Sequence, residues 1–318
     1  MEWFGDHMKK TSICFSDIHP FVRYVQNLRI VREVYPACSN VVPYDARIFY
    51  VHSGKGTLHI DGEEFALSRG QAMLWMAGVN YLIRSDDEIN DPLILLGCNF
   101  DFIQADRQYT TPIPPDPTDT FDPSRIRADV EITDFPRMNK PVIIGNMQSI
   151  EEPLLRMVRE YKTQKLFFSE KLSSILSEII VSIGRRVVLY DSDNGMSAEQ
   201  GDRIIAYIHE HYAEALDNKR LGQIFGYHPN HLNRIMKRYT GRTLHQYLCR
   251  YRIACAVDML LATTMPIAEI ATGVGFYDAS HFSNAFKRIM GCAPGELRGG
   301  LSPLASAAAI KKDESTTP

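Results

Sequence analysis

The segment HLNRIMKRYTG, residues 231–241, recurs fifty positions later as HFSNAFKRIMG, residues 281–291. The copies share His, Lys, Arg and Gly at equivalent positions, and apolar matches apolar at Leu232/Phe282, Ile235/Ala285 and Met236/Phe286. Upstream of each copy, residues 221–226 and 270–275 are also similar. A short apolar helix, a glycine turn and an amphipathic helix carrying Lys-Arg form the helix-turn-helix pattern. Two tandem copies therefore predict a module that reads double-stranded DNA.

The first motif is expected to begin with a supporting helix at 200–211 and a short second helix at 221–225. Pro229 suits the first position of the recognition helix, where a missing N–H is no loss. Leu232, Ile235 and Met236 form its apolar stripe. Polar side chains on the other face can reach base edges and phosphates. The predicted DNA-binding residues of this helix are Asn230, His231, Asn233, Arg234, Lys237 and Arg238.

The second motif repeats this organisation, with Asp278 as the expected N-cap of its recognition helix. Residues 244–262 predict a linking helix of roughly 19 residues, which at about 1.5 Å per residue spans just under 30 Å. Successive major grooves on one side of DNA lie about 34 Å apart, so this helix is a suitable spacer. The competing interpretation is that each Lys-Arg pair belongs to a solvated helix face. The predicted DNA-binding residues here are Ala279, Ser280, His281, Ser283, Asn284, Lys287 and Arg288.

Residues 270–294, with the pattern IAxxVGFxxxxHFxxxFKRxxGxxP, resemble the signature of AraC/XylS-type bacterial transcription regulators. Arg252, Ala256 and Leu260 fit the same pattern, and the resemblance covers about residues 200–298. It implies that each module binds two successive major grooves. Two departures are His228, where the family usually has Ser, and Cys292-Ala293 before Pro294. The first is expected to weaken the helix start by up to roughly 1 kcal/mol.

Residues 41–104 read as short strands divided by glycine turns, which favours a small β-sandwich or barrel. Asp61-Gly62 is a suitable two-residue hairpin turn. The Pro- and Asp-rich residues 110–124 are expected to be irregular. We predict strands at 47–52, 57–60, 64–67, 72–76, 81–84 and 93–100.

This strand pattern resembles the cupin-like sensor domain common in the same family, over about residues 25–105. His52 and His59 stand singly, and Asn80-Tyr81 occupies the position where a metal-binding cupin has a later His. Two His without clustered carboxylates do not complete a metal site, so we expect no metal, no cofactor and no enzyme activity. A metallocupin enzyme with an appended DNA module is the remote alternative.

A barrel mouth without metal can still bind a small polar ligand. The family resemblance makes a sugar or sugar derivative the expected effector. Trp75 is more often a core residue than a sugar platform, the arginines have surface alternatives, and His52 has a core alternative. The candidate effector-binding residues, placed on inward positions, are Arg47, Tyr50, His52, Trp75, Tyr81 and Arg84.

From residue 150 to 190 the apolar period becomes helical. The second of two predicted helices is apolar over most of its circumference, with Leu172, Ile175 and Ile179 in its stripe. Such a helix needs burial on more than one side. A dimer interface and packing within the chain both satisfy that need. Residues 191–195 suggest a linker, and 303–318 a frayed tail.

The charge is uneven: residues 1–199 hold 21 Lys and Arg against 28 Asp and Glu, whereas residues 200–300 hold 12 against 8. This charge distribution is expected if the basic residues 200–300 contact DNA phosphates and the acidic residues 1–199 do not. An ordinary solvated surface can give similar numbers of charged residues. Six scattered Cys indicate a reducing compartment. The start lacks a signal peptide pattern, and no apolar run is long enough to span a membrane, so a cytoplasmic location is expected.

Together these patterns predict an α+β chain. Its parts are a cupin-like β-barrel or sandwich at 1–149, a helical dimerisation segment at 150–192, an all-α domain with two helix-turn-helix motifs at 197–298, and a tail at 299–318. The expected function is sequence-specific transcription regulation under a sugar-like effector. The expected partners are promoter DNA, a second copy of the chain, and RNA polymerase if the protein activates; no membrane is expected. The rival is a ligand-independent DNA-binding protein whose barrel only dimerises.

Overall fold

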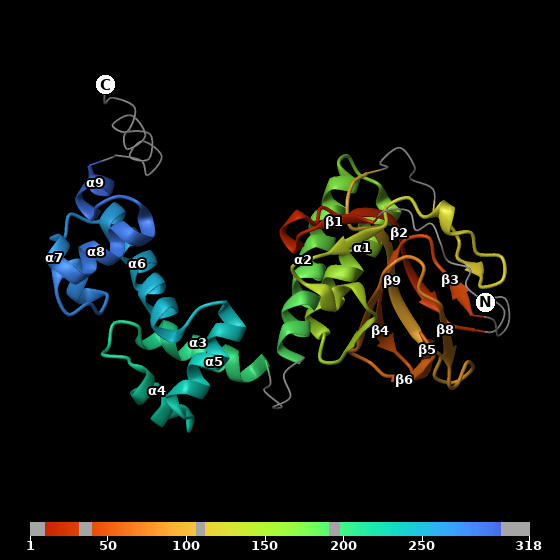
Figure 1. The fold of residues 1–318 in the computed structure, drawn as a ribbon, viewed down its shortest axis with the longest axis horizontal. Coiled ribbons are helices and arrows are strands. Elements are labelled where there is room, and N and C mark those ends of the chain that lie inside the picture. Colours follow the sequence, from red (N-terminus) through yellow and green to blue (C-terminus); the bar gives the residue numbers. More distant parts are fainter. Residues whose placement is uncertain (1–9, 32–39, 106–111, 191–197, 300–318) are drawn as a thin grey trace. The chain divides into compact units, whose positions relative to one another are not determined.

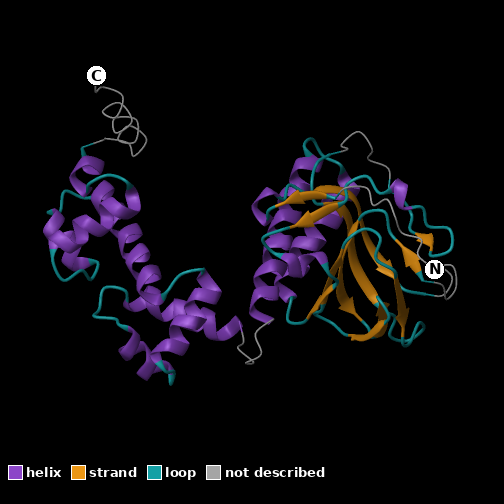
Figure 2. Ribbon diagram, in the orientation of Figure 1, coloured by secondary structure: helices purple, strands orange, loops and turns teal. Residues whose placement is uncertain are grey.

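The computed structural model describes residues 10–31, 40–105, 112–190 and 198–299. The chain divides into two compact units, Met1–Asp191, here called the N-terminal unit, and Ser192–Pro318, the C-terminal unit (Figure 1). The predicted linker at 191–195 and tail at 303–318 lie outside the described residues. The first unit combines sheets and helices and the second is helical, which gives the expected α+β class (Figure 2).

Two five-stranded antiparallel sheets form the body of the N-terminal unit. Their described strands pack as a sandwich and do not close into a barrel. The inner sheet has the order β12 (Val142–Ile144), β7 (Ala72–Trp75), β4 (Ala46–Ser53), β9 (Ile94–Asp101) and β2 (Phe21–Arg29). The outer sheet has the order β10 (Asp116–Pro117), β3 (Val41–Val42), β8 (Tyr81–Ser85), β5 (Gly56–Ile60) and β6 (Glu63–Leu67).

All six predicted strands are present, and the turn between β5 and β6 is the expected hairpin. Asp61 and Gly62 both have positive φ, 49° and 81°, as a two-residue type I′ turn requires. The predicted irregular stretch contains β10 and a 3₁₀ helix at Pro123–Arg125. Two further strands, β1 (Thr11–Ile13) and β11 (Val130–Ile132), form a small parallel pair.

The inner sheet is buried on both faces. One face packs on the outer sheet through a cluster that includes Phe49, Trp75 and Tyr81. The other packs on helices α1 (Glu151–Thr163) and α2 (Phe168–Tyr190) through a second cluster. Consequently every residue of β4 from Ala46 to Val51 is buried.

Packing within the chain accounts for the apolar face of α2. Leu172, Ile175 and Ile179 are at most 4% exposed and belong to the cluster that covers the inner sheet. The same cluster contains Ile183 and Val187. The stripe that also suggested a dimer interface is therefore core, and a dimer would have to use other residues.

Seven helices make up the described part of the C-terminal unit. In the first motif, buried Leu221 of the second helix accompanies Leu232, Ile235 and Met236 of the recognition helix. In the second, Phe282 and Phe286 belong to one buried cluster with Ile253 of the linking helix. The helices are α3 (Ala198–His211), α4 (Asn218–Phe225), α5 (Pro229–Thr240), α6 (Leu244–Ala262), α7 (Ile267–Gly273), α8 (Ala279–Met290) and α9 (Pro294–Arg298).

Candidate nucleic-acid interface

The first recognition helix, α5, begins where the sequence places it. Pro229 is its first residue, and His228 caps it by accepting a hydrogen bond on Nδ1 from the Asn230 backbone N–H at 3.3 Å. The imidazole thus substitutes for the usual Ser hydroxyl. Gly226 ends the preceding helix with φ of +70°, in the left-handed region that favours glycine.

The predicted DNA-binding residues of α5 divide into two groups. Asn230, Arg234 and Lys237 are exposed, whereas His231, Asn233 and Arg238 are half-buried. Asn233 Oδ1 accepts a hydrogen bond from the Leu244 backbone N–H at 3.1 Å, which ties α5 to the first turn of α6. That bond gives Asn233 a structural task in addition to its predicted one. His231 Nδ1 lies 2.8 Å from Arg234 Nη2.

The second recognition helix, α8, is capped as predicted: Asp278 Oδ1 accepts from the His281 backbone N–H at 2.7 Å. Its outer face carries fewer long polar side chains than that of α5. Ala279 and Ser283 are half-buried, and the others are exposed, namely Ser280, His281, Asn284, Lys287 and Arg288. The structure thus leaves Lys237, Lys287 and Arg288 exposed, while Arg238 is half-buried at the flank of α5.

One arginine of α6 joins the two motifs. Arg252 Nε donates to the Tyr212 carbonyl at 2.8 Å, and its Nη2 donates to the Glu214 carbonyl at 2.7 Å. Both carbonyls follow α3 of the first motif. The same guanidinium lies 5.9 Å from the ring centroid of Phe276 in the second motif. The turn at Gly275 also packs closely on this guanidinium, because a Cβ on Gly275 would lie only 2.9 Å from Arg252.

Three of the six predicted effector residues lie between the sheets. Arg47, Trp75 and Tyr81 are at most 2% exposed. Arg47 pairs with Trp75 of β7 on one side and with Asn99 of β9 on the other, so the three side chains form a row on one face of the inner sheet. The Trp75 and Tyr81 rings lie 4.7 Å apart.

Sequence reasoning missed the buried polar residues around this row. Arg23 pairs with Asp101, and Arg47 Nε lies 2.8 Å from Asp45 Oδ1; all four residues are buried. Burial raises the pKa of Asp45 from its ordinary 3.8 to about 6, against the opposing charge of Arg47. Asn99 Oδ1 and Trp75 Nε1 have no hydrogen-bond partner among the described residues. The sequence did carry a signal for these buried charges, because Arg23, Arg47 and Asp101 lie in otherwise apolar strands.

Tyr50 and His52 do not face the interior of the sandwich. Their side chains reach α1 instead: the Tyr50 hydroxyl donates to Glu151 Oε2 at 2.9 Å, and His52 Nδ1 lies 2.7 Å from Glu151 Oε1. Burial and the Glu151 carboxylate raise the pKa of Tyr50 to about 12. These two residues therefore connect β4 to the start of α1.

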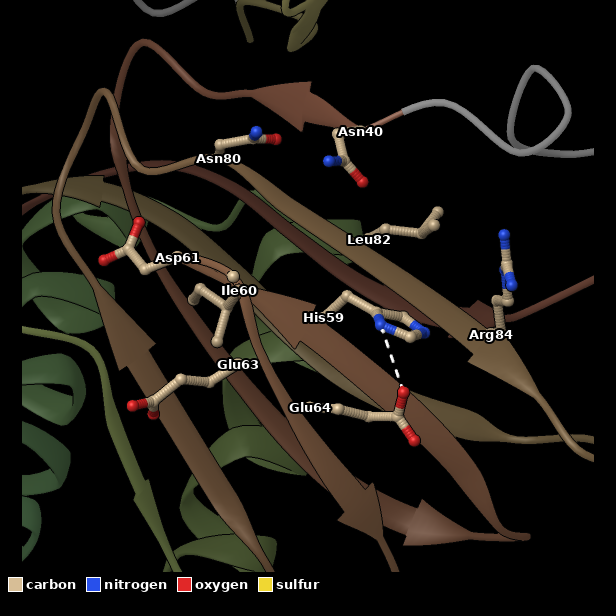
Figure 3. Close-up of a pocket in the computed structure, with 10 residues that line it drawn as sticks. Asn40, His59, Ile60, Asp61, Glu63, Glu64, Asn80, Leu82 and Arg84 are labelled. Atoms are coloured by element: carbon tan, nitrogen blue, oxygen red, sulfur yellow. Dashed lines mark ion pairs between the residues drawn. The ribbon is translucent and has the colours of Figure 1, made fainter.

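Arg84 points away from the interior as well. It lines a hollow of about 380 Å³ on the solvent face of the outer sheet, beside Asn80, Leu82 and His59 (Figure 3). His59 Nδ1 lies 3.5 Å from Glu64 Oε2 there. The prediction that Tyr50, His52 and Arg84 occupy inward positions is therefore wrong. Tyr50 and His52 face α1, and Arg84 faces solvent.

The described ranges contain neither a metal cluster nor a membrane span. There, no group of three or more His, Cys, Asp or Glu side chains is arranged to hold a metal ion. None of the described helices combines the length and apolar character needed to cross a membrane.

Comparison with known proteins gives one family model and several curated relatives. A family model described as "Helix-turn-helix domain" matches residues 221–300. The transcriptional activator RhaS of Escherichia fergusonii is 28% identical over 154 residues, which cover 48% of this chain and 55% of RhaS. RhaS of Mannheimia succiniciproducens is 34% identical over 108 residues, 34% of this chain and 40% of its own length. The chain thus spans about half the length of the curated relatives it matches, or less.

Three solved structures are similar to parts or most of the chain, all with low TM-scores. The C-terminal domain of AraT, a response regulator from Geobacillus stearothermophilus, is 30% identical and covers 34% of this chain and 90% of its own, with a TM-score of 0.32. The DNA-binding domain of AdpA, solved with a target DNA, is 23% identical, covers 31% and 90%, and has a TM-score of 0.31. An apo form of a ToxT variant from Vibrio cholerae is 14% identical, covers 92% and 100%, and has a TM-score of 0.33.

Proposed function

We propose that this chain is a transcription regulator of the AraC/XylS family that binds promoter DNA with both of its helix-turn-helix motifs. The observation that carries the proposal is the pair of recognition helices on one rigid spacer. Helices α5 and α8 belong to motifs that a single 19-residue helix, α6, connects. Arg252 fixes that helix to both motifs.

Base recognition would come mainly from α5. Arg234 is exposed on its outer face, and arginine can bind the O6 and N7 atoms of guanine with two hydrogen bonds. The smaller Ser280 and Asn284 of α8 offer less discrimination. Lys237 and Lys287 suit phosphate contact, because an ammonium is a point charge without a directional fork.

The test is selection of bound sequences from a random double-stranded library by the full-length protein. Wild type should enrich two half-sites one helical turn apart, as two successive major grooves require. Arg234→Ala should lose about 1–3 kcal/mol of binding free energy and relax one base pair of the site. Equal weakening on every sequence would instead make Arg234 a phosphate contact. Failure of wild type to enrich any site would overturn the proposal.

The N-terminal unit would bind the effector between its sheets. The row Trp75–Arg47–Asn99 and the Tyr81 ring supply an aromatic surface and hydrogen-bonding groups in one place. Buried polar atoms normally have partners, and Trp75 Nε1 and Asn99 Oδ1 have none in the described chain. A sugar or sugar derivative, with hydroxyls and an apolar ring face, fits that chemistry.

A second copy of the chain and RNA polymerase complete the proposal. Because the main α2 stripe is buried, a dimer would use side chains that remain accessible, such as Val181 and Val188 at 38% and 39% exposure. Contact with RNA polymerase follows only if the protein activates transcription, as the matched RhaS proteins are named activators. We also propose that the protein is cytoplasmic and has no enzyme activity.

A further inference from the structure

A hollow of about 550 Å³ lies in the C-terminal unit beside the linking helix α6. Three parts of the chain form its walls: Arg242 in the turn after α5, the exposed side of α6, and the last turns of α8. The lining residues are Arg242, His245, Gln246, Cys249, Arg250, Arg288 and Ile289.

The charged side chains in the lining are all basic. The lining contains three arginines and one histidine and no acidic residue. Arg242, Arg250 and Arg288 are exposed, and none of them forms an ion pair with the residues that the structure describes. The C-terminal unit holds other arginines that are paired, such as Arg220 with Glu214 at 2.6 Å. Three unpaired guanidinium groups around one hollow produce a local positive potential that favours an anion.

The hollow is continuous with the recognition surfaces. Arg288 follows Asn284 by one helical turn on α8, so both side chains lie on the same side of that helix. Arg242 directly follows Gly241, the C-cap of α5. His245, Gln246, Cys249 and Arg250 share one side of the first half of α6. The basic lining therefore bridges the two helices predicted to enter the major grooves.

We propose that this hollow holds the sugar–phosphate backbone of DNA where it passes between the two major grooves. The inference rests on the proposed function and adds a site outside both recognition helices. Arginine suits it, because its planar fork donates two parallel hydrogen bonds to phosphate oxygens. Contacts of this kind position the protein on the duplex and carry no sequence information.

The test is the salt dependence of binding by the full-length protein, measured on its selected site and on unrelated DNA. Each phosphate contact contributes about 0.9 to the slope of log K against log salt. Arg250→Ala should lower the magnitude of that slope by about 0.9, and Arg242→Ala with Arg250→Ala by about 1.8. Both should weaken specific and unrelated DNA alike and leave the selected sequence unchanged. Arg250→Lys should keep most of the slope.

Two controls separate the possible outcomes. Arg185→Ala removes an exposed arginine of α2 in the N-terminal unit and should leave the slope at the wild-type value. Lys287→Ala, on the recognition helix, should lower the slope by about one. If wild type and the Lys287 variant behave as expected but the Arg250 and Arg242 variants keep the wild-type slope, the hollow does not hold DNA. Absence of wild-type binding would contradict the proposed function itself.

Discussion

At the scale of single residues, the structure distinguishes side chains that the sequence presents as equivalent. Asn233 and Arg234 are neighbours on α5, and the helical pattern predicts that both reach DNA. Only Arg234 is exposed, while the Asn233 amide oxygen caps the start of α6. A helical pattern predicts which face a residue occupies, but it carries no information about a hydrogen bond to the next helix.

Asp45 is the residue whose charge should make the stability of the N-terminal unit depend on pH. Its pKa is about 6 in the folded chain and near 3.8 when solvated, so the folded state binds the proton more tightly. Linkage then requires this carboxyl to stabilise the fold below about pH 4 and to lose that contribution as the pH rises to about 6. The cause is desolvation of the carboxylate, which the ion pair with Arg47 only partly offsets.

Asp45→Asn should remove that dependence. Trp75 and Trp3 are the two tryptophans, both in the N-terminal unit, so tryptophan fluorescence reports its unfolding. Between about pH 4 and 7 the stability difference between variant and wild type should shift in favour of the variant. A difference that stays constant over this range would show that Asp45 does not titrate there. The comparison uses the slope of the unfolding free energy against pH, because the cost of leaving Arg47 without its partner is the same at each pH and cancels.

At the scale of elements, sequence patterns predict the helices better than the strands. Residues 244–262 are expected as one helix and form α6 with those bounds, because caps and a continuous apolar pattern mark both ends. Strand β2 is absent from the sequence-based prediction. Its register shifts between Val22 and Tyr24, which breaks the two-residue alternation, and its buried Arg23 interrupts the apolar run.

The orientation of side chains within β4 is also beyond the sequence. Both faces of the inner sheet are covered, so residues 46–51 are all buried and no alternation tells the two sides apart. Arg47 faces the outer sheet while Tyr50 faces α1, and residues three apart in one strand must point to opposite faces, so the prediction of one ligand site for both was wrong on the alternation alone. Placing the candidate effector residues needs the sheet order, which depends on contacts far apart in the sequence.

The element most open to test is α6, through Arg252. Arg252→Ala removes two charged hydrogen bonds to carbonyls after α3, each worth about 1.5–3 kcal/mol, and the contact with Phe276. We expect the helical signal in circular dichroism to be lost at a lower temperature than in wild type. The unfolding transition followed by tryptophan fluorescence should be unchanged. Arg252→Lys should recover only part of the loss, because one ammonium cannot reproduce the fork. If Arg252→Ala unfolds at the same temperature as wild type, the two motifs hold together without this residue.

At the scale of the whole molecule, sensing requires that the two units affect each other. By linkage, an effector that changes the affinity for DNA by some factor must have its own affinity changed by the same factor when DNA is bound. Couplings of this kind are typically about 5- to 150-fold. The rival function, in which the N-terminal unit only dimerises, predicts no such factor.

Thermal shifts with monosaccharides, disaccharides and sugar acids should identify a ligand, because one present at about 100 times its dissociation constant adds about 2.7 kcal/mol. In wild type the shift should appear in tryptophan fluorescence. In Trp75→Phe, which removes the indole N–H between the sheets, it should diminish when unfolding is followed by the binding of an extrinsic dye, because that variant lacks the buried fluorophore. The ligand's dissociation constant, measured with and without the selected DNA site, should then change by the factor found for DNA. A ligand that binds without changing DNA affinity would separate binding from regulation, and a flat panel with intact DNA binding would exclude the tested sugars as effectors.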